Sequence, residues 1–151
     1  MKKPVEGMPF VDFLDLCQSP RDCFAFLVSS GFSLASEKYP RTNSFKDGFS
    51  FKYIKEPVSV QVQYYDMEYD ILFTRRNRSI PYLFIDRLIF NNHSDLQRNM
   101  FPRHKLLNVV ARTATDVEQN YQPILNGDEF VWQKLMEHFN AKEKPKSYFE
   151  R

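Results

Sequence analysis

Hydrophobic and polar residues alternate in three short segments between Gly48 and Phe73, where the chain reads GFSFKYIKEPVSVQVQYYDMEYDILF. Because side chains on a strand point alternately to opposite sides, each segment predicts a strand with one apolar face. The apolar positions are Phe49, Phe51, Tyr53, Val58, Val60, Val62, Tyr64, Ile71 and Phe73. Residues 55–57 and 66–68 supply the turns. The pattern predicts an antiparallel β-meander with one face on the core and one face in water.

Apolar residues at helical spacing precede the meander, from Pro9 to Ser30. Ser19 and Pro20 interrupt this spacing as an N-cap and a first helical residue, which predicts a short helix before Ser19 and a second helix from Pro20 to Ser30. Gly31 is expected to end the second helix as its C′ residue. The segment 33–38 then predicts an edge strand, so we expect a meander of about four strands.

Helical patterns return after the meander. A short helix is predicted near residues 84–90, a surface loop over residues 91–101, and the longest amphipathic helix after Pro102. Pro123 is expected to constrain or kink the last turn of that long helix. Gly127 and Asp128 predict a C′ glycine followed by the N-cap of a final helix.

This order of helices, meander and helices predicts an α+β fold, with an antiparallel sheet packed by N-terminal and C-terminal helices. A chain of 151 residues is long enough for one domain with a substantial core. We expect a single domain over residues 1–151, with frayed tails at 1–8 and 141–151.

The net charge and the N-terminal pattern of the chain bear on its partners and its location. The chain carries 21 Lys and Arg against 19 Asp and Glu, and a formal charge of +2 gives too weak a field to indicate nucleic acid or an anionic membrane. Glu6, Asp12 and Asp15 interrupt the place where a signal peptide would have its apolar core. We expect a cytoplasmic protein without membrane contact. The pattern leaves the oligomeric state open.

The sequence contains no recognisable catalytic or metal-binding motif. Its histidines are His93, His104 and His138, and its cysteines are Cys17 and Cys23. None of them has a second ligand at the spacing of a metal site, and no glycine-rich phosphate loop is present. We therefore expect no catalytic residue, no metal and no cofactor. Asp66, Glu68 and Asp70 cluster near a turn, and we interpret them as solvated turn residues rather than as acid–base groups.

Basic and aromatic residues offer the best candidate for a binding surface. The candidate contact residues are Tyr64, Tyr65, Arg75, Arg76, Arg78 and Tyr82. The run from Arg75 to Arg78 is too polar for us to expect it buried, and tyrosine and arginine are the side chains that most often anchor interfaces. Ordinary solvated basic residues are the competing interpretation.

Several segments of the chain resemble small bacterial immunity-type proteins that are encoded beside polymorphic or contact-dependent toxins. The resemblance lies in residues 29–32 (SSGF), 48–53 (GFSFKY), 58–66 (VSVQVQYYD) and 71–73 (ILF), and the order of elements matches from about Phe10 to Phe149. It implies a non-enzymatic protein that binds one cognate toxin domain and blocks it. The alternative is a nucleic-acid-associated or regulatory module that uses the same basic and aromatic residues.

Overall fold

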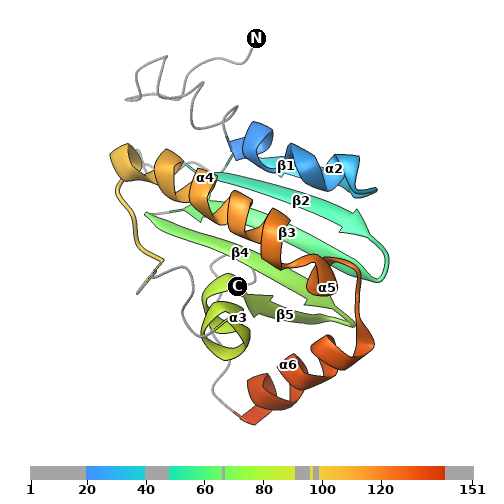
Figure 1. The fold of residues 1–151 in the computed structure, drawn as a ribbon. Coiled ribbons are helices and arrows are strands. Elements are labelled where there is room, and N and C mark those ends of the chain that lie inside the picture. Colours follow the sequence, from blue (N-terminus) through green and yellow to red (C-terminus); the bar gives the residue numbers. More distant parts are fainter. Residues whose placement is uncertain (1–19, 40–47, 66, 91–95, 97–98, 142–151) are drawn as a thin grey trace.

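The computed structural model describes residues 20–39, 48–65, 67–90, 96 and 99–141 (Figure 1). Five antiparallel strands form one sheet in chain order, which confirms the α+β class and the meander. The strands are β1 (Ser33–Lys38), β2 (Phe49–Lys55), β3 (Val58–Tyr65), β4 (Glu68–Arg75) and β5 (Arg78–Pro81). The helices are α2 (Ala25–Ser29), α3 (Tyr82–Ile89), α4 (Arg103–Asn120), α5 (Gln122–Leu125) and α6 (Glu129–Ala141). Helix α4 crosses one face of the sheet, α2 lies near β1, and α3 and α6 lie near β5 (Figure 1).

The apolar face of the meander forms the core, as the alternation predicted. Phe51, Val62 and Ile71 lie opposite one another on three neighbouring strands, and all three are fully buried. Helix α4 covers them with a buried stripe that includes Leu106 and Val110. Since each such side chain contributes about 1.5–3 kcal/mol when buried, this contact between the sheet and α4 stabilises the fold substantially.

Tyr121, at the C-terminal end of α4, is the centre of an aromatic cluster. Its ring lies 5.3 Å from that of Phe73, 5.4 Å from that of Tyr82 and 4.9 Å from that of Phe90, measured between centroids. These rings come from β4, from the first residue of α3 and from the residue after α3. The cluster therefore fixes α3 and the end of α4 against the sheet.

The helix ends follow the predicted signals with two differences. Gly31 (φ 102°) and Gly127 (φ 70°) adopt the left-handed conformation of C′ residues, and Asp128 caps α6 by accepting the Val131 N–H at 3.0 Å. Pro123, however, lies in the first turn of the separate helix α5, where its missing N–H costs no hydrogen bond, so the predicted kink in the long helix is wrong. The predicted helix from Pro20 is also divided, since a turn at the buried Phe24 precedes α2.

The fifth strand is the main addition to the predicted meander. Residues 78–81 were not predicted as a strand, because four residues give too short an alternation to identify one. In the structure they pair with β4 from Leu72 to Arg75. Since β5 stops there, the first half of β4 pairs on that side with residues 99–101 instead, through Tyr69 N–H to Asn99 O (2.7 Å) and Phe101 N–H to Met67 O (2.8 Å).

The second face of the sheet is less open to water than predicted. Ser50, Gln63 and Leu72 on this face are all buried. Gln61 Nε2 donates to Ser50 Oγ at 2.8 Å, so polar side chains on this face bind one another. The expectation of a fully wet face is therefore wrong.

Some predictions fall on parts of the chain that the structure does not describe. The helix before Ser19, the tail at 1–8, Asp66, Cys17, His93 and most of the 91–101 loop lie outside the described residues. At the other end, Ala141 is the last residue of α6, and the rest of the predicted tail lies outside the description. None of the described helices is both long enough and apolar enough to cross a membrane.

Candidate functional site

Three of the predicted contact residues meet at the turn between β4 and β5. Arg75 ends β4 and pairs directly with Arg78, which begins β5. Arg76 and Asn77 form the two-residue turn between them, and both have positive φ values (53° and 64°). Such values are typical of the tight turns that match the twist of a hairpin. The turn therefore places three arginines side by side at one end of the sheet.

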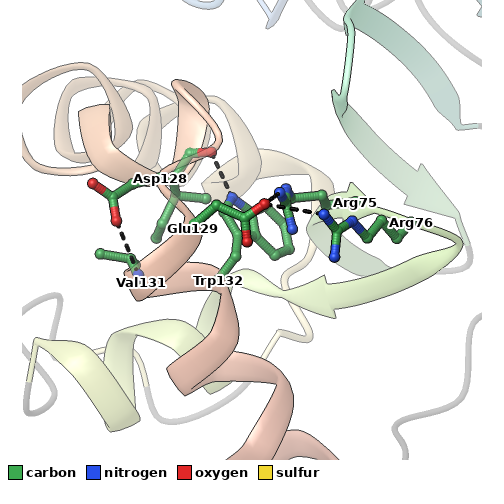
Figure 2. A network of polar contacts seen from close by, with 7 residues as sticks. Arg75, Arg76, Asp128, Glu129, Val131 and Trp132 are labelled. Atoms are coloured by element: carbon green, nitrogen blue, oxygen red, sulfur yellow. Dashed lines mark hydrogen bonds and ion pairs between the residues drawn. The ribbon is translucent and has the colours of Figure 1, made fainter.

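Glu129 binds this turn to the start of α6. Its Oε1 atom accepts hydrogen bonds from Arg75 Nη2 at 2.5 Å and from Arg76 Nη2 at 3.0 Å (Figure 2). Arg75 is only 6% exposed, whereas Arg76 and Glu129 have side chains that are 68% and 67% exposed. The expectation that Arg75 is too polar to be buried is wrong, because β-strand alternation places it on the helix-covered face and Glu129 neutralises it there.

The arginines retain unused hydrogen-bonding capacity. Arg75 Nε and Arg78 Nη1 are buried and have no hydrogen-bond partner among the described residues. A guanidinium group has five N–H donors and no acceptor, so one carboxylate does not satisfy three such groups. The turn is thus a site of local positive charge with room for further acceptors around Arg76.

The position of α6 is set by the residues that surround Glu129. Asp128 caps the helix, and one turn later the buried Trp132 donates from Nε1 to the Ile124 carbonyl at 2.9 Å (Figure 2). Phe130, the residue after Glu129, is 78% exposed. Aromatic and arginine side chains are enriched at protein–protein interfaces, so an exposed phenylalanine that follows the partner of two arginines is a candidate interface anchor. We call Arg76, Arg78, Glu129 and Phe130 the hairpin surface.

The three tyrosines of the predicted surface lie elsewhere. Tyr64 is at the opposite end of β3 from Val58, the partner of Arg75, and six residues of strand separate the two ends by about 20 Å. Tyr64 is buried and donates its hydroxyl to the Phe101 carbonyl at 2.9 Å. Tyr65 is half-buried and pairs with Glu68. Tyr82 is buried in the aromatic cluster around Tyr121. The six residues therefore do not form one patch.

A cavity of about 440 Å³ lies along α4, with Tyr82 and Leu96 among its walls. Asp116 on α4 lines it and accepts a hydrogen bond from the Tyr82 hydroxyl at 2.5 Å. No pattern in the sequence predicted this cavity. Tyr82 and Asp116, which meet in its wall, are 34 residues apart in the chain.

Asp70 differs from the solvated turn residue that was predicted. It lies within β4, where its Oδ1 accepts the Ile71 N–H at 2.9 Å, and it lines a small recess with Leu96, Asn99 and Phe101. Burial raises the pKa of Asp70 from 3.8 to about 7, although the Ile71 N–H acts in the opposite direction. The carboxyl is therefore partly protonated at neutral pH.

The cysteine and histidine side chains that the structure describes do not come together in a catalytic or metal-binding arrangement. No group of three or more His, Cys, Asp or Glu side chains is placed to hold a metal ion within the described ranges. Burial raises the pKa of the Cys23 thiol, which makes the reactive thiolate less accessible. His104 and His138 are exposed, and His138 Nδ1 lies 3.0 Å from the Lys134 carbonyl of its own helix.

No protein-family model matches the chain, and no curated protein or solved structure matches it either.

Proposed function

We propose that the chain is a non-enzymatic intracellular binding protein that neutralises a cognate protein, a toxin domain, by direct contact through the hairpin surface. The observation that supports this most is the exposed Phe130, the residue after Glu129, whose carboxylate binds Arg75 and Arg76 at the β4–β5 turn. Aromatic and arginine side chains carry most of the binding energy at protein interfaces. An acidic patch on the partner is the matching surface.

The internal packing of this region supports a preformed site. Arg75 and Arg76 bind Glu129 at the start of α6, and Trp132 donates to the Ile124 carbonyl of α5, so that Arg76 and Phe130 project from a fixed support. A surface that is already ordered loses less conformational entropy on binding than a loop does.

The nucleic-acid alternative has less support from the geometry. Binding to single strands needs exposed aromatic rings beside basic side chains, but Tyr64 and Tyr82 are buried and use their hydroxyls within the fold. Only Tyr65 keeps a partly exposed ring among the three predicted tyrosines.

Co-expression with the products of the two genes that flank this one tests the proposal. We expect one flanking product to co-purify as a complex that survives nuclease treatment and to lose its toxic activity. If the flanking genes encode metabolic enzymes, or if binding follows generic nucleic acid with a steep salt dependence, the proposal is wrong.

A further inference from the structure

The arginines at the β4–β5 turn carry more charge than the carboxylate that binds two of them. Arg75 and Arg78 lie directly opposite each other on neighbouring strands, and Arg76 lies in the turn between them. Like charges at directly opposed strand positions destabilise a sheet. Within the described part of the chain, Glu129 forms ion pairs with Arg75 and Arg76. This corner of the molecule therefore retains an excess of positive charge. We call Arg75, Arg76 and Arg78 the arginine corner.

Unsatisfied N–H donors show the same imbalance. Arg75 is 6% exposed, yet its Nε atom has no hydrogen-bond partner among the residues that the structure describes. Arg78 Nη1 is likewise buried and lacks a partner there. A buried donor without an acceptor costs free energy, and a guanidinium group cannot lose its charge. The arginine corner can therefore use more acceptor oxygens than Glu129 supplies.

Glu129 is held on Arg76 in a way that allows exchange. Its Oε1 atom accepts both hydrogen bonds, from Arg75 Nη2 at 2.5 Å and from Arg76 Nη2 at 3.0 Å (Figure 2). The side chains of Glu129 and Arg76 are 67% and 68% exposed, and an ion pair between two such solvated groups contributes little. The N-terminal end of α6 favours a negative group at this place, whichever residue supplies it. An incoming carboxylate can thus replace that of Glu129 at small cost.

We propose that the arginine corner is an oxyanion-binding site that Glu129 occupies in the free protein, and that a carboxylate side chain of the protein partner takes its place in the complex. A planar carboxylate matches the fork of a guanidinium group and can accept two parallel hydrogen bonds from it. The assignment of this carboxylate to a protein partner rests on the proposed function, whereas the oxyanion site itself does not.

Chemical rescue tests the oxyanion site without the partner. Glu129→Ala removes the carboxylate and leaves space beside the arginines, so its melting temperature should fall below that of the natural chain. Sodium acetate should then raise the melting temperature of this variant more than sodium chloride does at equal ionic strength, because an anion that binds only the folded state stabilises it. The natural chain should gain less from acetate, since Glu129 competes for the site.

Two further variants locate the rescue. Arg75→Met combined with Glu129→Ala removes the buried guanidinium group and should abolish the acetate-specific gain. Glu137→Ala, at an exposed position later in α6, reports the general effect of each salt on stability. The inference is overturned if acetate raises the melting temperature of Glu129→Ala no more than that of Glu137→Ala, or if the double variant keeps the gain. Rescue by sodium phosphate but not by acetate would overturn the assignment to a carboxylate.

The rescue and the co-purification experiment fail separately. Acetate-specific rescue without a binding partner would support the oxyanion site and overturn the proposed function. A partner that binds in the absence of any acetate-specific rescue would support the proposed function and overturn the oxyanion site.

Discussion

Arg75 connects the sheet to α6 through a buried positive charge. Its guanidinium group lies on the helix-covered face of β4 and reaches Glu129, which remains 67% exposed at the start of α6. Removing a cation from water costs several kcal/mol unless a partner compensates it. The carboxylate of Glu129 is the compensating group that the structure describes, so the stability of this corner depends on both residues together.

Glu129→Gln should lower the free energy of unfolding by about 1–3 kcal/mol, because it leaves the buried Arg75 charge uncompensated. Urea denaturation measures this loss. The double variant Arg75→Met with Glu129→Gln should lose less than the sum of the two single variants. Glu137→Gln, on the exposed face of the same helix, is the control and should change stability little. Strict additivity of the single effects would contradict the coupling.

Asp70 should make stability depend on pH near neutrality. Burial raises the pKa of the folded carboxyl to about 7, so the folded state holds a proton that the unfolded state has already released. Asp70 therefore destabilises the fold increasingly as the pH rises from about 4 to about 7.

Asp70→Asn should be more stable than the natural chain above pH 7 and should flatten this part of the pH profile. Urea denaturation at a series of pH values measures both effects. The variant keeps a side-chain oxygen that can accept the Ile71 N–H. Parallel pH profiles for the two proteins would show that Asp70 does not titrate in this range.

Sequence patterns predicted which side chains of a strand are buried, but they did not predict contacts between residues that are far apart in the chain. The alternation predicted Tyr64 and Phe73 on the buried face correctly, because that information is local. The environment of Asp70 comes from Leu96, Asn99 and Phe101, which are 26 or more residues away, and no spacing in the sequence places them beside β4. The contact between Arg75 and Glu129 spans 54 residues and is equally invisible.

At the scale of elements, α6 is positioned by its first turn. Asp128 caps the helix, Glu129 binds the turn between β4 and β5, and Trp132 reaches the α5 carbonyl of Ile124. The three contacts are made by residues within five positions, so the direction of the helix is fixed near its N-terminus. The sequence predicted the cap, since Gly127 and Asp128 form a recognisable boundary. The sequence also contained a signal that the predictions did not use: Phe130 falls on the side of α6 opposite its apolar stripe, where an exposed aromatic residue is expected.

Asp128→Ala should lower the free energy of unfolding by about 1 kcal/mol through loss of the helix cap. Asp128→Ser retains a capping oxygen and should recover most of this loss. Urea denaturation of the two variants provides the comparison. Equal stability of the serine and alanine variants would mean that the cap contributes nothing measurable.

At the scale of the whole molecule, the hairpin surface and the cavity along α4 are made by different elements. The hairpin surface belongs to β5, α6 and the turn before β5, whereas the cavity belongs mainly to α4. Both are supported by the same core, in which α4 and the aromatic cluster around Tyr121 cover the sheet. Substitutions of exposed residues at one site can therefore be tested without loss of the fold.

The double variant Arg76→Ala with Phe130→Ala should weaken binding to the cognate protein at least about tenfold, since it removes the exposed anchors of the hairpin surface. Its free energy of unfolding should stay within about 0.5 kcal/mol, because both side chains are exposed and the ion pair of Arg76 is solvated. Surface plasmon resonance and urea denaturation measure the two quantities. Lys134→Ala, an exposed residue on α6, is the matched control. Undiminished affinity in the double variant would place the interface elsewhere.

The pairing of residues 99–101 with β4 has a consequence for synthesis of the chain. The meander can form hairpin by hairpin as it emerges, because every strand pairs with its neighbour in sequence. The first half of the outer edge of β4 is different, since its backbone partners come from Asn99 and Phe101. Until those residues leave the ribosome, this half of the strand has open hydrogen-bonding groups that another nascent sheet could pair with. Arrival of residue 101 thus marks the point at which this half of the β4 edge becomes paired.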